Sequence, residues 1–452
     1  MAASAADDHR STSSNAHNGA MKPLRFLFVS SEGSMSDVAW QVLQEGHEVR
    51  FHVENHKEDG DVGDGFVTKV EKWRPSVRWA DVIVFDDTLG HGKLAQRLRA
   101  NGKKVIGGTP YTDRLEDDRE FGQQELKRHG VSILSQVTFS DYSEAIEYIR
   151  RHPDQYVIKP SGEAQNTKRL LFIGEESDGS DVIRVLESYS RVWNKYMKTF
   201  QLQERVRGVE VAVGAFFNGH RFLEPINVNF EHKRFFSGDI GPMTGEMGTT
   251  MFWSDPNEIF TGTLRKLEPR LAAERFVGYI DINCIVNGSG IFPLELTPRF
   301  GFPTIFIQTE SLAMPTAEFL YRLAAGEDFR IKTKRGYHIG VRVVVPPFPF
   351  RGDRRTFETY SKNATIVFRR SQTLEGVHIE DVKLVNGVWA IAGTTGVALV
   401  VTGSGSTMPQ AQEQVYERIQ NILIPNKYYR TDIGDRWRED IDHLHTWGYL
   451  RR

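Results

Sequence analysis

The stretch Phe292-Pro-Leu-Glu-Leu-Thr-Pro-Arg-Phe-Gly-Phe-Pro303 is the most informative part of this chain. It follows a strand-like run, Gly278-Tyr-Ile-Asp-Ile-Asn-Cys-Ile-Val286, across an Asn-Gly turn, and this order predicts a β-hairpin. In such a hairpin Asp281 and Glu295 can lie side by side, where their carboxylates repel each other unless a cation lies between them. Oxygen ligands suit Mg²⁺, and Arg299 suits a planar anion. The alternative interpretation is a surface hairpin with scattered charges.

Two further segments carry a resemblance to a known family. Phe236-Ser-Gly-Asp-Ile-Gly-Pro-Met-Thr-Gly-Glu-Met-Gly248 resembles the signature loop of glycinamide ribonucleotide synthetase (phosphoribosylamine–glycine ligase), which reads close to Asp-x-Gly-Pro-Asn-Thr-Gly-Gly-Met-Gly. His232-Lys-Arg234 is similar to the end of the family's Asp-His-Lys-Arg, and Leu294-Glu-Leu-Thr-Pro-Arg-Phe-Gly301 is similar to its Glu-Phe-Asn-x-Arg-Phe-Gly. The matches keep their order and spacing, and the resemblance extends over roughly residues 24–436.

The resemblance implies a fold, because this family belongs to the ATP-grasp superfamily. We expect an α/β chain with an ATP-grasp fold, a Rossmann-like (pre-ATP-grasp) N-terminal domain and a β-rich C-terminal domain. The expected parts are a disordered tail at 1–20, the N-terminal domain at 21–110, the ATP-grasp domain at 111–330, the C-terminal domain at 335–436 and a C-terminal extension at 437–452. Trp437, Trp447 and Tyr449 indicate that the extension packs against the protein.

Hydrophobic periodicity indicates alternating strands and helices at the N-terminal end. The first turn lacks the Gly-x-Gly-x-x-Gly fingerprint, which disfavours a nicotinamide-dinucleotide domain. Strands are predicted at residues 24–29, 49–53, 82–85, 104–106, 156–159, 199–206, 209–217, 221–229, 340–345, 364–368 and 397–402. Helices are predicted near 35–46, 92–101, 113–129, 256–275, 309–325 and 408–423.

Composition limits the class of protein. With 57 basic and 59 acidic residues among 452, the net charge of −2 gives no reason to expect bulk nucleic-acid binding. Cys284 is the single cysteine, so an intramolecular disulfide is excluded and a reducing compartment fits. No stretch approaches the roughly twenty apolar residues of a transmembrane helix, and the first twenty residues are too polar for a signal peptide. We therefore expect a cytoplasmic protein that binds no membrane.

Three basic residues are candidates for binding nucleotide phosphates. Lys159 ends an apolar strand and matches the lysine of the family's Val-Ile-Lys-Ala-Asp-Gly, which implies a phosphate-binding and catalytic role. Arg119 stands where the family has a phosphate-binding lysine, although a solvated helix charge is the alternative. Lys168 lies in the place of the family's glycine-rich flap, where a plain solvated loop is the alternative.

Gln201-Leu-Gln-Glu-Arg-Val-Arg-Gly208 resembles the strand through which the family binds adenine. The resemblance implies that the backbone of Glu204, Arg205 and Val206 meets the adenine edge, and that Glu210 holds the ribose hydroxyls. Alternating apolar and polar residues also fit an ordinary amphipathic strand.

The metal and substrate residues follow from the same motifs. Asp281 and Glu295 are the predicted carboxylate ligands of Mg²⁺ or Mn²⁺, with Thr297 in the place of the family's asparagine. Arg299 is expected to stabilise charge on an acyl phosphate. The predicted substrate residues are His232, Lys233, Asp239, Gly241, Thr244 and Gly245.

The chain departs from the family where the amine substrate would bind. The family's first turn, Gly-Gly-Arg-Glu-His-Ala, becomes Ser31-Glu-Gly-Ser-Met-Ser36, which carries no cation. Its Gly-Pro-Glu-x-Pro-Leu becomes Phe85-Asp-Asp-Thr-Leu89, and its Arg-Phe-Gly-Asp-Pro-Glu becomes Arg299-Phe-Gly-Phe-Pro-Thr304. The ATP half is therefore retained and the amine half is rewritten.

The expected function is an ATP-dependent carboxylate–amine ligase that forms an amide through an acyl phosphate, with glycine or another small amino acid as the carboxylate and an altered amine. The cofactors implied are ATP and Mg²⁺ or Mn²⁺, and the expected state is a monomer or homodimer. Two alternatives stay open: phosphoribosylamine–glycine ligase itself, and a non-catalytic nucleotide-binding protein.

Overall fold

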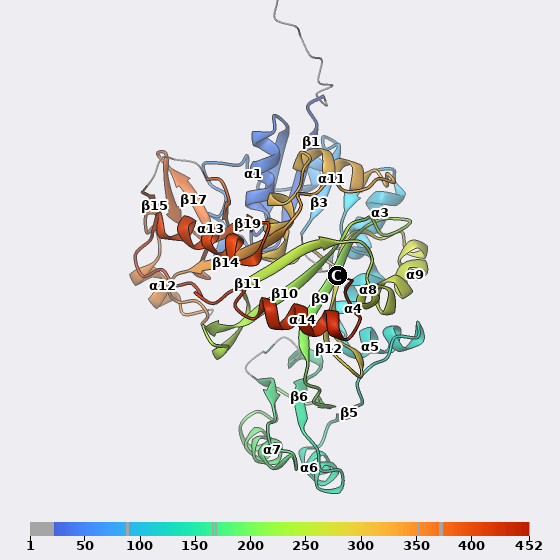
Figure 1. Cartoon of the computed structure of the whole chain (residues 1–452). Coiled ribbons are helices and arrows are strands. Elements are labelled where there is room, and N and C mark those ends of the chain that lie inside the picture. Colours follow the sequence, from blue (N-terminus) through green and yellow to red (C-terminus); the bar gives the residue numbers. More distant parts are fainter. Residues whose placement is uncertain are drawn as a thin grey trace, which may run out of the picture.

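The computed structural model describes most of the chain as an α/β protein with a small lobe beside a larger body (Figure 1). The described residues are 22–86, 90–164, 167, 170–350, 352–369 and 374–451. The tail expected at residues 1–20 lies outside the described residues, and so does Lys168.

The N-terminal region is a parallel sheet with strand order β2-β1-β3-β4, as the alternating pattern predicts. Its strands are β1 (Arg25–Ser30), β2 (Glu48–Val53), β3 (Val82–Phe85) and β4 (Lys104–Ile106), and its helices are α1 (Ser36–Gln44), α2 (His56–Asp59), η1 (Arg74–Val77) and α3 (Gly92–Ala100). Because side chains alternate along a strand, Phe26 and Phe28 of β1 are buried in the core that includes α1, whereas Leu27 and Val29 are buried in the core that includes α3. The sheet is therefore covered on both faces.

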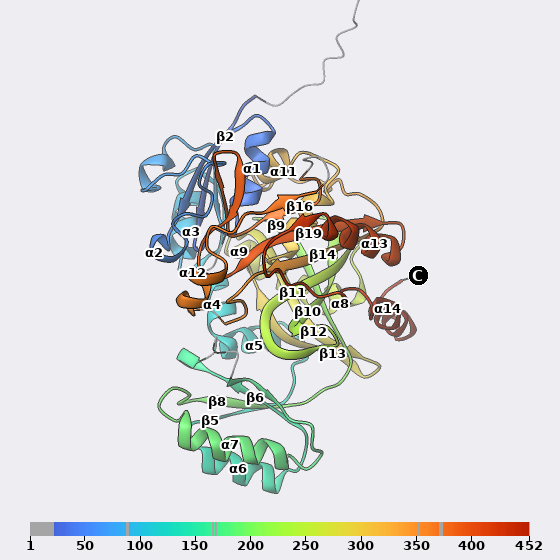
Figure 2. The same ribbon diagram turned by 90° about the vertical axis from the view of Figure 1, so that its left-hand side faces the viewer.

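The small lobe is a four-stranded sheet with helices on one face (Figure 2). Its elements are β5 (Gln136–Phe139), α6 (Tyr142–Arg151), β6 (Tyr156–Pro160), η2 (Gly162–Ala164), β7 (Phe172–Ile173), α7 (Ser180–Val192) and β8 (Phe200–Glu204). Ile149, Leu186 and Phe200 belong to its own buried core. The lobe therefore has a core separate from that of the larger body.

An eight-stranded antiparallel sheet forms the centre of the larger body, with strand order β13-β12-β9-β10-β11-β14-β19-β16. These strands are β9 (Val209–Asn218), β10 (Ile226–Phe236), β11 (Ile240–Ser254), β12 (Val277–Asn287), β13 (Gly290–Thr297), β14 (Tyr337–Val344), β16 (Val377–Ile379) and β19 (Val397–Gly405). Strand β11 pairs with β14, so the sheet continues across the interval 330–335 between the expected ATP-grasp and C-terminal domains. The β-rich C-terminal region thus extends the same sheet.

Three predicted helices are divided in the structure. The observed helices are α4 (Pro110–Asp117), α5 (Arg119–Arg128), α8 (Glu258–Gly262), η4 (Leu264–Leu267), α9 (Glu268–Ala273), α10 (Thr304–Glu310) and α11 (Thr316–Ala324). Asp118 ends α4 and caps α5 by accepting a 3.0 Å hydrogen bond from the Phe121 N–H. Pro269 lies in the first turn of α9, where its missing N–H has no helical partner to lose. The strand predicted at 221–229 begins only after Pro225.

The C-terminal region carries smaller elements around the large sheet. They are α12 (Arg354–Tyr360), β15 (Val367–Phe368), β17 (Val382–Val385), β18 (Val388–Ile391), α13 (Met408–Gln420), β20 (Ile422–Leu423) and α14 (Trp437–Thr446). The ring of Trp437 lies 5.2 Å from that of Phe230, and the Tyr449 hydroxyl donates a 3.0 Å hydrogen bond to the Asn287 carbonyl. The prediction that the C-terminal extension packs is therefore confirmed.

None of the helices in the described residues is both long and apolar enough to span a bilayer.

Candidate active site

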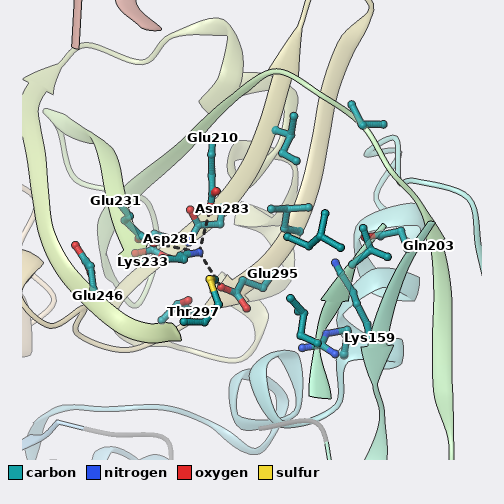
Figure 3. Close-up of a pocket in the computed structure, with 18 of the residues that line it drawn as sticks. Lys159, Gln203, Glu210, Glu231, Lys233, Glu246, Asp281, Asn283, Glu295 and Thr297 are labelled. Carbon is teal, nitrogen blue, oxygen red and sulfur yellow. Dashed lines mark hydrogen bonds and ion pairs between the residues drawn. The ribbon is translucent and has the colours of Figure 1, made fainter. Parts of the chain in front are cut away.

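A cavity of about 580 Å³ lies between the small lobe and the eight-stranded sheet. Figure 3 shows its two sides: Lys159 and Gln203 come from the small lobe, and a group of acidic residues around Lys233 comes from the sheet. The predicted site residues that line the cavity are Arg119, Lys159, Glu204, Arg205, Val206, Glu210, Lys233, Gly245, Asp281, Glu295, Thr297 and Arg299. The cavity therefore gathers residues that are far apart in the chain.

The predicted hairpin is formed by β12 and β13, and its register sets the positions of the acidic residues. Asp281 lies opposite Thr297, and Asn283 lies opposite Glu295. Asp281 and Glu295 are therefore diagonal neighbours rather than directly opposed. All four residues line the cavity, because alternate residues of a strand share one face.

Lys233 is the centre of a carboxylate cluster. Its Nζ atom lies 3.0 Å from Glu210, 3.3 Å from Glu231 and 3.5 Å from Glu295. Burial disfavours the charge of Lys233, but the three carboxylates outweigh burial and hold the pKa of its ammonium well above the ordinary value. In this conformation the lysine supplies the cation that the clustered carboxylates require.

Several buried oxygens beside this cluster are suited to a further cation. Asp281 Oδ1, Asn283 Oδ1 and Glu246 Oε1 have no hydrogen-bond partner among the described residues. Burial, reinforced by the charge of Glu231, raises the pKa of both Asp281 and Glu246 well above the ordinary values. A divalent cation would offset this cost, so the donor set fits Mg²⁺ or Mn²⁺. The described residues contain no preformed cluster of three or more His, Cys, Asp or Glu ligands, so the metal role stays a prediction.

Asn283 is a neighbour of the predicted metal residues that sequence reasoning missed. Its Nδ2 donates hydrogen bonds to the two carboxylate oxygens of Glu231 at 3.2 and 3.3 Å. Its Oδ1 has no hydrogen-bond partner among the described residues and can therefore accept a ligand. Thr297 lies opposite Asp281 in the hairpin. Asn283 thus offers the amide oxygen that Thr297 lacks.

Two cations, Lys159 of β6 and Arg119 of α5, also line the cavity. Lys159 is 8% exposed and makes no ion pair within the described residues. Burial, together with the charge of Arg119, lowers the pKa of Lys159 to about 8. Arg119 donates a 2.8 Å hydrogen bond to the Pro160 carbonyl, which fixes the guanidinium beside the same strand. Two desolvated cations at one place favour an anionic ligand.

The strand predicted to bind adenine lies on the cavity wall. The Arg205 N–H donates to the Gln155 carbonyl at 2.9 Å, and the Glu204 N–H donates to the Ser135 carbonyl at 3.1 Å. The Val206 N–H has no hydrogen-bond partner within the described residues. Of the three predicted backbone donors, Val206 is therefore the one available to a ligand. Gln203, which the sequence analysis did not select, adds a buried Nε2 without a partner in the same part of the structure.

Arg299 is a further lining residue of the cavity. Its Nε and Nη2 donate to Glu116 Oε1 at 3.1 and 2.9 Å, and its Nη1 donates to the Phe300 carbonyl at 2.9 Å. These bonds hold the guanidinium in place. Glu116 is a positioning residue that sequence reasoning missed, although it stands in the Leu-Glu pair preceding Arg119.

The structure does not bring all the predicted substrate residues to the cavity. His232 lies on the opposite face of β10 from Lys233, and burial lowers the pKa of its ring to about 4. Asp239 lies in the turn before β11 and pairs with Arg430 at 2.8 Å and Arg436 at 3.0 Å. Gly241 and Thr244 are likewise not part of the cavity wall. Direct substrate contact by these residues has no support in this geometry.

A second cavity, of about 280 Å³, adjoins the first. The two share Gly245, Arg299 and Phe302 as a common wall. The remaining residues of the second cavity are Ser31, Glu32, Ser34, Asp86, Arg342, Glu380, Asp381, Thr395 and Val397. Three residues of the Ser31–Ser36 turn (Ser31, Glu32 and Ser34) and Asp86 therefore line a cavity that shares Arg299 with the first cavity.

Residues 117–303 match the family model described as phosphoribosylglycinamide synthetase, ATP-grasp (A) domain. The phosphoribosylamine–glycine ligase of Thermotoga maritima is 25% identical over 433 residues, which cover 92% of this chain and 100% of that protein. The phosphoribosylamine–glycine ligase of Streptococcus pneumoniae is 23% identical over 365 residues, which cover 78% of this chain and 82% of that protein.

Solved structures show the same fold. The crystal structure of the Thermotoga maritima phosphoribosylamine–glycine ligase has a TM-score of 0.68 at 20% identity, covering 91% of this chain and 100% of that chain. A second similar structure is the biotin carboxylase domain of the Hydrogenobacter thermophilus 2-oxoglutarate carboxylase, in complex with MgADP and bicarbonate. It has a TM-score of 0.60 at 12% identity, and the match covers 95% of this chain and 100% of that chain. The expected ATP-grasp fold is confirmed.

Proposed function

We propose that this chain, an ATP-grasp ligase related to the glycinamide ribonucleotide synthetase (phosphoribosylamine–glycine ligase) family, joins a small carboxylate to an amine other than phosphoribosylamine. The observation that carries the proposal is the cavity that sets Lys159 and Arg119 opposite a carboxylate cluster, with Arg299 at the boundary to a second cavity. On this proposal, the nucleotide binds in the first cavity and the acceptor binds in the second.

The reaction proceeds in two steps. A carboxylate oxygen attacks the γ-phosphorus of ATP, the bond to ADP breaks, and an acyl phosphate forms. The neutral amine then attacks the acyl carbon, phosphate leaves with the C–O electron pair, and the nitrogen loses a proton to give the amide. Lys159 and Arg119 lie where they can bind phosphates, and Arg299 can stabilise charge on the acyl phosphate.

Asp281 and Glu295 would hold Mg²⁺ or Mn²⁺, with Asn283 and Thr297 as neutral oxygen donors beside them. A bound ion supplies positive charge to the phosphates as they react. The residues of this chain do the positioning: Glu116 fixes Arg299, and Lys233 keeps Glu210, Glu231 and Glu295 together until the ion and nucleotide arrive.

The proposed location is the cytoplasm, because Cys284 is a buried free thiol that suits a reducing compartment. A monomer or homodimer remains the proposed state.

The chemistry can be tested before the natural amine is known. We expect hydroxylamine, offered with Mg-ATP and a panel of small carboxylates headed by glycine, to trap the acyl phosphate as a hydroxamate with ADP and phosphate as the nucleotide products. Chromatography of the nucleotides and a colorimetric hydroxamate assay are the measurements. AMP and pyrophosphate as main products would exclude the proposed mechanism, and tight ATP binding without turnover of any carboxylate would favour the non-catalytic alternative.

The second candidate, phosphoribosylamine–glycine ligase, is favoured by the names of the relatives. We expect phosphoribosylamine and glycine to give a turnover at least a hundredfold below the roughly ten per second typical of enzymes. The physical reason is that the Ser31–Ser36 turn carries no cation and that Asp86 adds negative charge beside the second cavity. The measurement is a coupled ADP assay with freshly generated phosphoribosylamine, with the Thermotoga maritima enzyme as positive control. A turnover near ten per second would establish the second candidate instead.

A further inference from the structure

One lysine ammonium lies among carboxylates that are proposed to serve two different ligands. Figure 3 shows Lys233 within the acidic group of the first cavity. Its Nζ atom lies 3.0 Å from Glu210, 3.3 Å from Glu231 and 3.5 Å from Glu295. Glu210 is the residue proposed to hold the ribose hydroxyls, and Glu295 is a proposed ligand of the metal ion. The lysine therefore links a nucleoside-binding residue to a metal-binding residue.

The three carboxylates differ in how far they are accessible to a ligand. The side chains of Glu210 and Glu295 are 37% and 49% exposed, whereas that of Glu231 is 10% exposed. A ligand that enters the cavity can therefore reach Glu210 and Glu295 first. Glu231 and Lys233 belong to the same strand, β10, and both line the cavity. Their ion pair can thus persist while the other two ion pairs are broken.

The side chain of Lys233 can move while its backbone stays in place. The Thr244 hydroxyl donates a 2.7 Å hydrogen bond to the Lys233 carbonyl, which ties this part of β10 to β11. A lysine ammonium is a compact charge on a flexible four-carbon stem. Rotation of the side chain within the cavity of about 580 Å³ can therefore release Glu210 and Glu295.

Both proposed ligands compete with the ammonium. An ion bound by Glu295 would lie close to Lys233 Nζ, and like charges at short range repel strongly. Glu210 must likewise turn its oxygens from the ammonium towards the ribose hydroxyls. Whichever ligand binds first has to displace the lysine, and the second ligand then finds its carboxylate released. Two ligands that displace the same side chain therefore strengthen each other's binding.

We propose that Lys233 is an internal competitor that couples nucleoside binding to metal binding: its ammonium holds Glu210 and Glu295 in the free chain and leaves both when either ligand binds. This inference rests on the proposed ligase function, because it requires that the first cavity binds ATP and the ion. It goes beyond that function, since it predicts that the free chain binds the ion weakly and that the nucleoside strengthens this binding.

The coupling can be measured on the unaltered chain with adenosine, which has the ribose hydroxyls but no phosphate to bind the ion itself. Electron paramagnetic resonance of free Mn²⁺ gives the affinity for the ion with and without about 10 mM adenosine. We expect adenosine to tighten Mn²⁺ binding about fivefold or more. Dideoxyadenosine without the two ribose hydroxyls offers no donor to Glu210, so it should leave the Mn²⁺ affinity unchanged.

Lys233→Met removes the competing charge and keeps a flexible side chain. We expect this variant to bind Mn²⁺ without nucleoside at least about tenfold more tightly than the unaltered chain, and adenosine should no longer change its Mn²⁺ affinity. Lys127→Met, an exposed change on α5, is the matched control and should behave as the unaltered chain does. Circular dichroism reports whether Lys233→Met is folded, and the adenosine measurement on the unaltered chain decides the inference if it is not.

Titration with Mg-ATP separates this inference from the ligase proposal. If Mg-ATP binds but adenosine leaves the Mn²⁺ affinity of the unaltered chain unchanged, the coupling is overturned while the ligase proposal stands. A folded Lys233→Met variant that binds Mn²⁺ no more tightly than the unaltered chain also overturns it, and so does an equal effect of dideoxyadenosine. If Mg-ATP itself fails to bind, the proposed ligase function fails, whatever Mn²⁺ does.

Discussion

Glu295→Gln is expected to reduce turnover by a hundredfold or more while the protein stays folded. The amide keeps the size of the side chain but removes one negative charge from the predicted metal site, and removal of a single charge-stabilising group in an active site costs roughly 10²–10³ in rate. The apparent affinity for Mg²⁺ should fall at least tenfold, because even the loss of a residue that only hydrogen-bonds a metal ligand typically costs about tenfold in metal affinity. The measurements are ADP release in the hydroxylamine assay and its dependence on Mg²⁺ concentration.

Folding should be little affected by the same change. Glu295 Oε1 is 3.5 Å from Lys233 Nζ, and Glu210 and Glu231 remain to pair with the lysine. Since half-exposed ion pairs contribute about 1 kcal/mol or less, the free energy of unfolding should change by no more than that. Glu413→Gln, exposed on α13, is the matched control. Full activity of Glu295→Gln at limiting Mg²⁺ would show that the hairpin is not the metal site.

Much of the fold could be predicted because the local hydrophobic patterns of neighbouring segments agree with the way these segments pair in the structure. The runs at 278–286 and 292–297 alternate in the way that a hairpin requires, and β12 and β13 pair there. Lys159 could be selected because a lysine at the end of an apolar strand is expensive without an anion. The division of helices was less predictable, because the cap at Asp118 and the helix start at Pro269 are set only once packing fixes the helix axes.

The carboxylate cluster could not be predicted in the same way. Glu210, Glu231 and Glu295 come from three strands, and their meeting at Lys233 depends on sheet order and register. His232 is a further residue whose position depends on strand geometry. It is adjacent to Lys233 in the sequence, but the two-residue period of β10 places it on the other face of the sheet. The alternation of Glu231, His232 and Lys233 along a strand is the sequence signal for this difference between the two neighbours.

The second cavity shows how much a departure from a family motif can predict about a site. The absence of a cation in Ser31–Ser36 was visible in the sequence, but the identity of the opposing wall was not. Glu380 and Asp381 are separated from this turn by hundreds of residues and reach it only because β16 completes the large sheet. Motif loss therefore supports the proposal of an altered amine, whereas the residues of the opposing wall could be found only from the packing.

Lys159→Met is expected to lose turnover by a hundredfold or more and, at the same time, to make the protein more stable. Burial lowers the pKa of Lys159 from 10.5 to about 8, which means that the charged lysine destabilises the folded state. At pH 7 the lysine is protonated in both the folded and unfolded states, so this cost is fully present. It disappears as the pH rises from about 8 towards 10.5. Methionine removes the cost, and we expect the free energy of unfolding at pH 7 to rise by about 2 kcal/mol.

The same lysine should also make the affinity for ATP depend on pH. Because a protonated Lys159 attracts phosphates, ATP affinity should be greatest below pH 8 and fall by up to tenfold per pH unit above it. Lys159→Arg should bind ATP with little pH dependence over this range, since a guanidinium stays charged, and Lys127→Met, an exposed change on α5, should match the wild type. Titration of ATP from pH 6.5 to 9.5 and urea unfolding at pH 7 are the measurements. A Lys159→Met variant that is less stable and still turns over ATP would show that the lysine is structural. A cation that is retained to bind an anionic ligand instead destabilises the protein when the ligand is absent.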